Sequence, residues 1–110
     1  MIATGGRAVL PLIAERTQEV AELCARFKVR RLDLFGSATG PQFDVQRSDL
    51  DFLVEFEPLP VGQYADAYFG LREGLAEMFG RQVDLIVSSA VANPYLRESI
   101  ERTRALLYAA

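Results

Sequence analysis

The sequence predicts an α/β fold of the α+β kind, in which helices cover a small mixed β-sheet. Three short runs have the composition and alternation of strands, at residues 29–35, 49–56 and 82–87. About a dozen residues join the first two runs, too few for a helical crossover, so we expect these strands to be antiparallel neighbours. A helical pattern separates the second run from the third, which favours a parallel, right-handed connection. With helical patterns at both ends of the chain, the expected order is α-β-β-α-β-α.

The first half of the chain is predicted to form one helix and two strands. From about Ala8 to Lys28, apolar residues recur at helical spacing, with Pro11 in the first turn, where proline is tolerated. Residues 1–7 precede this helix as a loose leader. In the run 49–56, period-two alternation separates a core face from a face that bears carboxylates. The core face carries Leu50, Phe52, Val54 and Phe56, and the opposite face carries Asp49, Asp51, Leu53 and Glu55.

The second half is predicted to form a helix, a strand and a last helix. A helical pattern covers residues 61–79. Gly70 and Gly74 lie four residues apart on one face of this helix, where the missing side chains allow a neighbour to approach closely. Residues 93–94 are Asn-Pro, which is typical of an N-cap followed by a first-turn proline. We therefore expect the last helix over residues 95–107.

Composition limits the classes of protein that the chain can represent. Its 110 residues suit a single domain over 1–110, and its net charge of −3 argues against nucleic-acid binding by a broad basic surface. The absence of histidine excludes Ser-His-Asp triads and most zinc sites. The single cysteine, Cys24, lies in an apolar helical pattern and cannot form an internal disulfide, so a reducing, cytoplasmic location is expected. No stretch has a membrane-spanning or signal-peptide pattern.

Polar groups are expected to gather at one end of the predicted sheet. Gly36-Ser37 closes the first strand and Asp49 opens the second, so antiparallel pairing places them together. Asp49 and Asp51 share a face, and Asp84 joins them if the third strand lies beside the second. Three unpaired carboxylates would repel one another, and a divalent cation with a preference for oxygen ligands would relieve this repulsion. A glycine and a hydroxyl beside such a site suit the phosphates of a nucleoside triphosphate.

Two segments together resemble a known signature. Residues 34–37, Leu-Phe-Gly-Ser, are followed after eleven residues by 49–54, Asp-Leu-Asp-Phe-Leu-Val. This pattern resembles the Gly-Ser…Asp-x-Asp signature of the DNA polymerase beta-like nucleotidyltransferase superfamily, and is most similar to its minimal bacterial and archaeal branch, the MNT-type domains. Residues 80–87 resemble the third-carboxylate strand of that branch. The resemblance extends from the first predicted helix to the last and implies the nucleotidyltransferase fold.

The resemblance implies a role for each matched position. Asp49 and Asp51 would bind two metal ions, Mg²⁺ or Mn²⁺, with Asp84 as the third ligand and an aid to deprotonation of the attacking hydroxyl. Gly36 and Ser37 would hold the β- and γ-phosphates of a nucleoside triphosphate, expected to be ATP. Attack on the α-phosphate would then release pyrophosphate.

The sequence departs from the family pattern directly after the Gly-Ser pair. The family often has Arg-Gly there, whereas residues 38–41 are Ala-Thr-Gly-Pro, which bears on nucleotide affinity more than on the metal site. Arg47 is the nearest arginine in the loop, either as a substitute or as a solvated side chain. Asp33, just before the motif, leaves two interpretations open, a functional acid and a structural one.

The identity of the acceptor follows from the size of the chain and the resemblance. The chain has no residues to spare for a second, acceptor-holding domain, so we expect a partner protein to carry the acceptor. Minimal domains of this branch typically pair with a helical HEPN protein, often as antitoxin to its RNase toxin, and are thought to transfer AMP to a tyrosine of that partner. The resemblance therefore implies a protein adenylyltransferase with antitoxin function. No membrane partner is expected, because no stretch is long and apolar enough to span a bilayer.

Two alternatives to that function stay open. One is a non-catalytic antitoxin or scaffold with a degenerate nucleotide site. The other is a nucleotidyltransferase with a small-molecule or RNA acceptor, of which the acidic composition disfavours RNA. Homo- or hetero-oligomer formation is left open.

Overall fold

The computed structural model describes residues 11–36 and 49–110. In this part of the chain, four strands form one sheet in the order β3-β2-β1-β4. β1 pairs antiparallel with β2 and β4, and β2 pairs parallel with β3, as the connection lengths predict for the first three strands. The predicted fold class, a small mixed sheet with helices, is confirmed. The strands are β1 (Val29–Phe35), β2 (Leu50–Phe56), β3 (Val83–Val87) and β4 (Ala105–Ala109).

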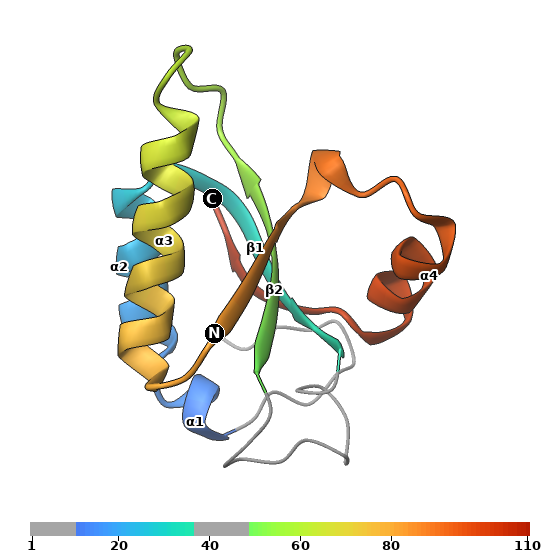
Figure 1. Cartoon of the computed structure of the whole chain (residues 1–110). Helices are drawn as coiled ribbons and strands as arrows, with labels where there is room; N and C mark the ends of the chain where they lie inside the picture. The colour runs from blue at the N-terminus through green and yellow to red at the C-terminus, as the bar shows by residue number, and fades with distance from the viewer. Residues whose placement is uncertain (1–10, 37–48) are drawn as a thin grey trace.

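Helices cover both faces of the sheet. Figure 1 shows α1 (Pro11–Ala14), α2 (Thr17–Arg26) and α3 (Tyr64–Phe79) on one side and α4 (Pro94–Thr103) on the other. A short 3₁₀ helix, η2 (Ser88–Ala90), follows β3. The main core lies between the sheet and α1–α3, and a smaller one lies under α4. Fully buried members of the main core include Leu32, Leu34, Phe52, Val54, Leu71 and Leu75.

The smaller core is built from the opposite faces of the same strands. Phe35 of β1 and Leu53 of β2 pack there with Val91 and with Ile100 of α4. α4 begins as predicted at an Asn-Pro pair, where the Asn93 side chain accepts hydrogen bonds from the two backbone amides at Tyr95 and Leu96. Because side chains alternate along a strand, this face is also the one that carries the predicted carboxylates of β2.

The predicted first helix is interrupted. The expectation was one helix over about residues 8–28, but α1 ends at Ala14 and α2 begins at Thr17. The Thr17 hydroxyl donates a hydrogen bond to the Ala14 carbonyl at 2.8 Å, and the Arg16 amide bonds the Ile13 carbonyl in the tighter i→i+3 pattern. Thus a local side-chain bond competes with the regular helical ladder. Residues 1–10, which include the predicted leader, lie outside the described residues.

The end of the chain differs more from the prediction. The last helix was expected to reach residue 107, whereas α4 ends at Thr103 and Ala105–Ala109 form β4. This strand pairs with β1, more than 70 residues earlier in the chain, so its backbone groups find partners in the sheet rather than in a further helical turn. The prediction that the order ends in a helix was therefore wrong, and the observed order adds a final strand.

Two further expectations agree with the structure. Cys24 is fully buried in the main core, and burial raises the pKa of its thiol to about 12, so it is an inert core residue. α2 packs close to Gly70 and Gly74 of α3, as their spacing predicts. Within the described residues, no helix combines the length and apolar character needed to cross a bilayer.

Candidate functional site

The ends of three strands meet at the candidate site. Gly36 directly follows β1, whose last residue, Phe35, is paired with Asp51 of β2. Asp51 is paired in turn with Asp84 across the parallel ladder to β3. The structure thus brings Gly36, Asp51 and Asp84 to one end of the sheet, where the sequence places them. Their catalytic roles stay a prediction.

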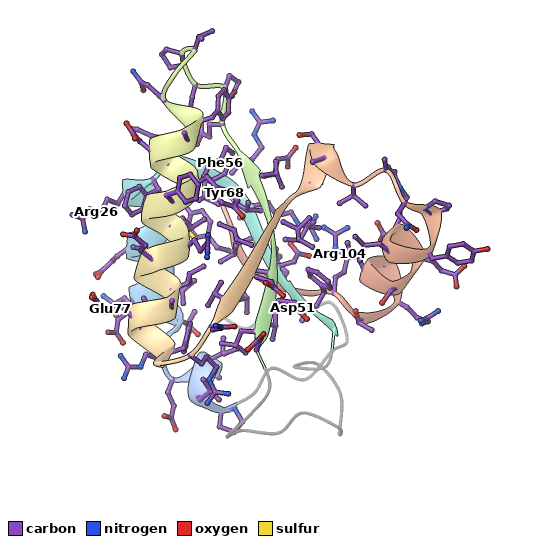
Figure 2. All side chains as sticks on the ribbon, viewed as in Figure 1. Arg26, Asp51, Phe56, Tyr68, Glu77 and Arg104 are labelled. Atoms are coloured by element: carbon purple, nitrogen blue, oxygen red, sulfur yellow. The ribbon has the colours of Figure 1, made fainter. Side chains whose placement is uncertain are left out.

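Gly36 packs directly against the Asp51 carboxylate. Its φ of +78° lies in the left-handed region that favours glycine. A Cβ atom at this position would lie 2.8 Å from Oδ2 of Asp51, closer than real Cβ atoms approach other heavy atoms. Glycine is therefore required on two independent grounds, its backbone conformation and the close approach of the Asp51 carboxylate (Asp51 is labelled in Figure 2).

Asp51 is an electrostatically strained carboxylate. Its pKa is raised to about 6, first by burial and then by the negative charge of Asp84, a hydrogen bond with Asp84 and the charge of Asp49. Asp51 is partly buried, whereas Asp84 and Asp49 are exposed. Two carboxylates that disfavour each other's charge in this way would be stabilised by a bound cation.

The remaining predicted site residues are less closely defined. Asp49 lies one residue before β2 and acts on Asp51 through its charge. Ser37, Arg47 and the Ala-Thr-Gly-Pro segment lie outside the described residues. Among residues 11–36 and 49–110, no three Asp, Glu, His or Cys side chains are grouped so as to hold a metal ion. The three-carboxylate metal site therefore stays a prediction.

Asp33 has a structural role in the described fold. It is fully buried, its Oδ1 accepts a hydrogen bond from Arg31 Nε at 2.7 Å, and its Oδ2 accepts one from Arg104 Nε at 2.7 Å. A buried carboxylate with two guanidinium partners is neutralised and fully hydrogen-bonded, which favours the structural interpretation. Arg104 was missed in the sequence because it lies 71 residues away and stands in the segment that was predicted as helix.

A second missed residue contacts the candidate site. Thr103, the last residue of α4, accepts a hydrogen bond from the Gly36 amide on its hydroxyl at 2.9 Å. No local pattern in the sequence links a threonine near the C-terminus with a glycine 67 positions earlier. The fold alone brings the two together.

Comparison with protein families places this site in a known context. The model of the nucleotidyltransferase domain family matches residues 18–107, most of the chain. The chain belongs to this family. The match includes Gly36, Asp51 and Asp84, so the strand ends described above lie within the nucleotidyltransferase domain.

Relatives of this nucleotidyltransferase domain carry names for adenylyl transfer. A protein of Methanocaldococcus jannaschii, provisionally named a protein adenylyltransferase, is 37% identical over 76 residues, which are 69% of this chain and 74% of the relative. The protein adenylyltransferase MntA of Thermococcus cleftensis is 34% identical over 88 residues, 76% of this chain and 85% of the relative. The chain is thus a nucleotidyltransferase of the kind to which named protein adenylyltransferases belong.

Solved structures agree with this assignment. A structure provisionally described as a minimal nucleotidyltransferase superimposes with a TM-score of 0.66 at 32% identity, over 91% of this chain and 97% of the other. A chain in the complex of a tri-AMPylated Shewanella oneidensis HEPN toxin with its MNT antitoxin gives a TM-score of 0.61 at 20% identity, over 89% and 73%. At that identity the second likeness concerns the fold alone. The resemblance to the MNT-type branch is confirmed.

The residues of this nucleotidyltransferase domain fit a hard divalent cation. Asp51 and Asp84 supply only oxygen donors. Burial, and then the negative charge of Asp84, raise the pKa of Asp51, and a bound cation would favour the charged form of both carboxylates. Asp49 is close enough to add to that repulsion and is exposed, so it is free to turn toward a ligand. These three carboxylates are the candidates to hold Mg²⁺ or Mn²⁺.

Proposed function

We propose that the protein is a Mg²⁺-dependent adenylyltransferase that transfers AMP from ATP to a HEPN-type partner protein, as the antitoxin of a toxin–antitoxin pair. The observation that carries the proposal is the pairing of Asp51 with Asp84 directly beside Gly36. Two repelling carboxylates packed against a glycine are costly for stability and are useful when a cation and a phosphate chain lie there.

In the proposed reaction, an acceptor hydroxyl of the partner attacks the α-phosphate of ATP. A new O–P bond forms, the bond between the α-phosphorus and the bridging oxygen breaks, and pyrophosphate leaves. The hydroxyl proton passes to a carboxylate, for which exposed Asp84 is the candidate. When bound, the divalent cations would neutralise the phosphate charge and polarise the α-phosphate. Asp49, Asp51 and Asp84 would hold them.

The candidate site assigns different tasks to its two sides. Gly36, at the β1 end, would lie beside the β- and γ-phosphates, and Ser37 would donate its hydroxyl to them. Asp84, on β3 at the edge of the sheet, lies on the far side of Asp51 from β1. The leaving pyrophosphate would therefore lie toward β1, and the attacking oxygen toward β3.

The relatives support a protein acceptor. Two of them are named protein adenylyltransferases, and a structural neighbour was solved as an antitoxin complex with an AMPylated HEPN toxin. By analogy, the partner is a HEPN-type protein, and its modification would block or mark the toxin. Both the cation and the acceptor class are thus open to direct experiment.

The test is label transfer to a HEPN-type partner protein. The wild-type protein is incubated with that partner, ATP labelled on the α-phosphate, and Mg²⁺ or EDTA. Asp51→Asn and Asp84→Asn remove one carboxylate each while they keep the shape of the side chain. Glu73→Gln, on the exposed face of α3, is the matched control because it removes a carboxylate distant from the site.

The proposal predicts label on the partner with wild type and Glu73→Gln, and its loss with either Asp variant or EDTA. Each Asp variant should lower the rate by at least about 100-fold, because a metal-binding carboxylate has no substitute. A tight complex that forms without label, and equally well with both Asp variants, would instead establish a non-catalytic antitoxin. The missing Arg-Gly after Ser37 makes that alternative worth measuring.

A further inference from the structure

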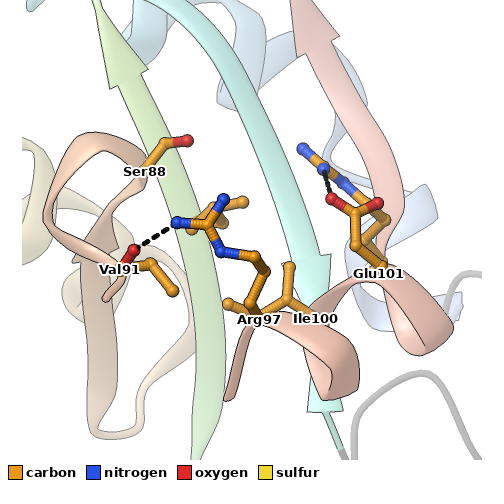
Figure 3. Close-up of a pocket in the computed structure, with 7 residues that line it drawn as sticks. Ser88, Val91, Arg97, Ile100 and Glu101 are labelled. Carbon is orange, nitrogen blue, oxygen red and sulfur yellow. Dashed lines mark hydrogen bonds and ion pairs between the residues drawn. The ribbon is translucent and has the colours of Figure 1, made fainter. Parts of the chain in front are cut away.

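A pocket lies on the same face of the sheet as the candidate site. Its cavity volume is about 50 Å³, and Leu53 of β2 is one of the residues that line it. Figure 3 shows the pocket in close-up, with Ser88, Val91 and Arg97 among its lining residues. Leu53 is two residues after Asp51 and therefore points to the same face, one pleat further along the strand. Across the ladder, Leu53 is paired with Ile86, two residues after Asp84. The pocket thus begins one pleat, about 7 Å, from the two carboxylates.

The lining combines an apolar surface with guanidinium groups. Leu53, Val91 and Ile100 supply apolar atoms, and Arg97 and Arg104 supply the guanidinium groups. Arg104 is occupied by Asp33 and Glu101, at 2.7 and 3.0 Å. Figure 3 shows Arg97 reaching from α4 across the pocket, where it donates one hydrogen bond to the Val91 carbonyl at 2.6 Å.

Arg97 differs from Arg104 in its partners. In the described part of the chain, no carboxylate lies within ion-pair distance of Arg97, and the bond to Val91 uses only one of its five N–H groups. The bond fixes the guanidinium at the pocket while leaving donors for a ligand. A guanidinium held over apolar side chains suits an occupant with a flat or apolar body and an oxygen atom at its edge.

The direction of the proposed reaction indicates which substrate enters this pocket. In-line displacement places the attacking oxygen opposite the leaving pyrophosphate. With the terminal phosphates toward Gly36 and β1, the attacking oxygen must come from the β3 side. Ser88 and Val91, which follow β3 in the chain, form that side of the pocket.

We propose, resting on the adenylyltransferase function above, that this pocket receives the hydroxyl-bearing acceptor side chain of the partner protein, with Arg97 as the residue that orients it. The cavity of about 50 Å³ admits the end of one side chain and is too small for a whole nucleotide, since pockets for drug-sized ligands begin at about 300 Å³. The acceptor oxygen then forms its bond to the α-phosphorus, its proton goes to Asp84, and pyrophosphate leaves on the Gly36 side.

The experiment separates the acceptor from the nucleotide. Arg97→Ala removes the guanidinium, and Ser88→Phe fills the pocket from η2. Arg102→Ala is the matched control, because Arg102 lies on the same helix, pairs with Glu98 and does not line the pocket. For each protein, the KM for the HEPN-type partner is measured at saturating ATP, and the Kd for a non-reactive α,β-methylene ATP analogue is measured by calorimetry with Mg²⁺.

Both pocket variants should raise the KM for the partner at least about tenfold, which corresponds to the free energy of a lost hydrogen bond to a charged donor. The Kd of the ATP analogue should stay within about twofold of the wild-type value. A higher Kd for the ATP analogue would overturn the proposal, because it would assign the pocket to the nucleoside. An unchanged KM for the partner would also overturn it, because the pocket would then bind neither substrate. If wild type transfers no label, the proposed function fails separately. Partner affinity without nucleotide then decides: weaker binding by Arg97→Ala and Ser88→Phe but not by Arg102→Ala supports the pocket, and equal binding by all proteins rejects it.

Discussion

The backbone amide of Gly36 donates a hydrogen bond to the hydroxyl of Thr103 at 2.9 Å, and that hydroxyl donates to the Ser99 carbonyl at 2.7 Å. The end of α4 therefore holds the glycine that passes the Asp51 carboxylate. Since this amide already has an acceptor, we expect Gly36 to contribute in two other ways: the missing Cβ leaves space for the Asp51 carboxylate, and the bond to Thr103 fixes where β1 ends. The position of the candidate phosphate-binding turn thus depends on a helix from the other end of the chain.

Thr103→Val should weaken nucleotide binding, because valine keeps the shape of threonine but can neither accept from Gly36 nor donate to Ser99. We expect a three- to tenfold rise in the Kd of the α,β-methylene ATP analogue, from loss of about 1 kcal/mol. Thr103→Ser keeps the hydroxyl and should restore the wild-type Kd. If valine lowers the midpoint of urea denaturation but leaves the Kd unchanged, Thr103 acts on stability alone.

Gly36→Ala should reduce both stability and activity. The left-handed backbone costs a non-glycine residue roughly 1 kcal/mol, and the new methyl group would displace the Asp51 carboxylate. The matched control is Gly62→Ala, which has a φ of +93° but open space around the position of its Cβ. Both variants should lose stability, and only Gly36→Ala should lower the rate of label transfer, by at least about tenfold. Equal rates of label transfer in the two variants would show that the space between Gly36 and the Asp51 carboxylate has no functional role.

The sequence was sufficient to predict the parts of the fold that depend on local rules. Loop length sets the antiparallel pairing of β1 with β2, and the intervening α3 sets the parallel pairing of β2 with β3. Period-two alternation then places Asp51 and Leu53 on the face away from the main core. Each of these rules depends only on a few neighbouring residues or on the length of one connection, so it can be applied to a single sequence.

Features that depend on distant partners could not be predicted in this way. β4 has apolar residues that also fit a helical pattern, and only its pairing with β1 makes it a strand. Likewise, Asp33 is neutralised by Arg104, which lies 71 residues later in the chain. Gly36 is held by Thr103, which lies 67 residues later. The pocket beside the candidate site is lined by the same segment around α4, so its existence also followed only from the fold.

Asp51 should make the metal-free protein less stable as pH rises. Its folded pKa of about 6 exceeds the unfolded value of about 3.9, so the folded state binds the proton more tightly. The stability from this group is fully present below about pH 4 and is lost as pH rises through 6. The two-unit difference corresponds to about 3 kcal/mol at most, and solvent screening of the partly exposed group reduces this to about 1–2 kcal/mol.

Urea denaturation between pH 4 and pH 7, in EDTA, measures this contribution. Asp51→Asn cannot titrate and should lose the part of the pH dependence that lies between pH 4 and 6.5. It should also be the more stable protein at pH 7. Glu73→Gln removes an exposed carboxylate on α3 and should keep the wild-type dependence of stability on pH. Parallel curves for Asp51→Asn and wild type would show that Asp51 has an ordinary pKa.

Asp33→Asn should destabilise the fold without a specific effect on catalysis. The change leaves Arg31 and Arg104 without the buried carboxylate that both contact, but both arginines keep some access to water. We therefore expect a loss of about 2–3 kcal/mol, at the lower end of the range for breaking a buried pair. Glu98→Gln, which breaks the exposed pair with Arg102, should cost less than about 0.5 kcal/mol. Comparable losses in the two variants would argue against the structural role of Asp33.

Gly70→Ala should destabilise the protein even though alanine is the better helix former. A Cβ at Gly70 would collide with the ring of Phe27, against which α3 packs. We expect a net loss of about 1–2 kcal/mol, because the overpacking cost exceeds the gain of about 1 kcal/mol in helix propensity. The test is a double-mutant cycle with Phe27→Ala, which removes the ring. In that background Gly70→Ala should become stabilising. An equal loss of unfolding free energy in both backgrounds would mean that the Phe27 ring is not the reason why position 70 needs a glycine.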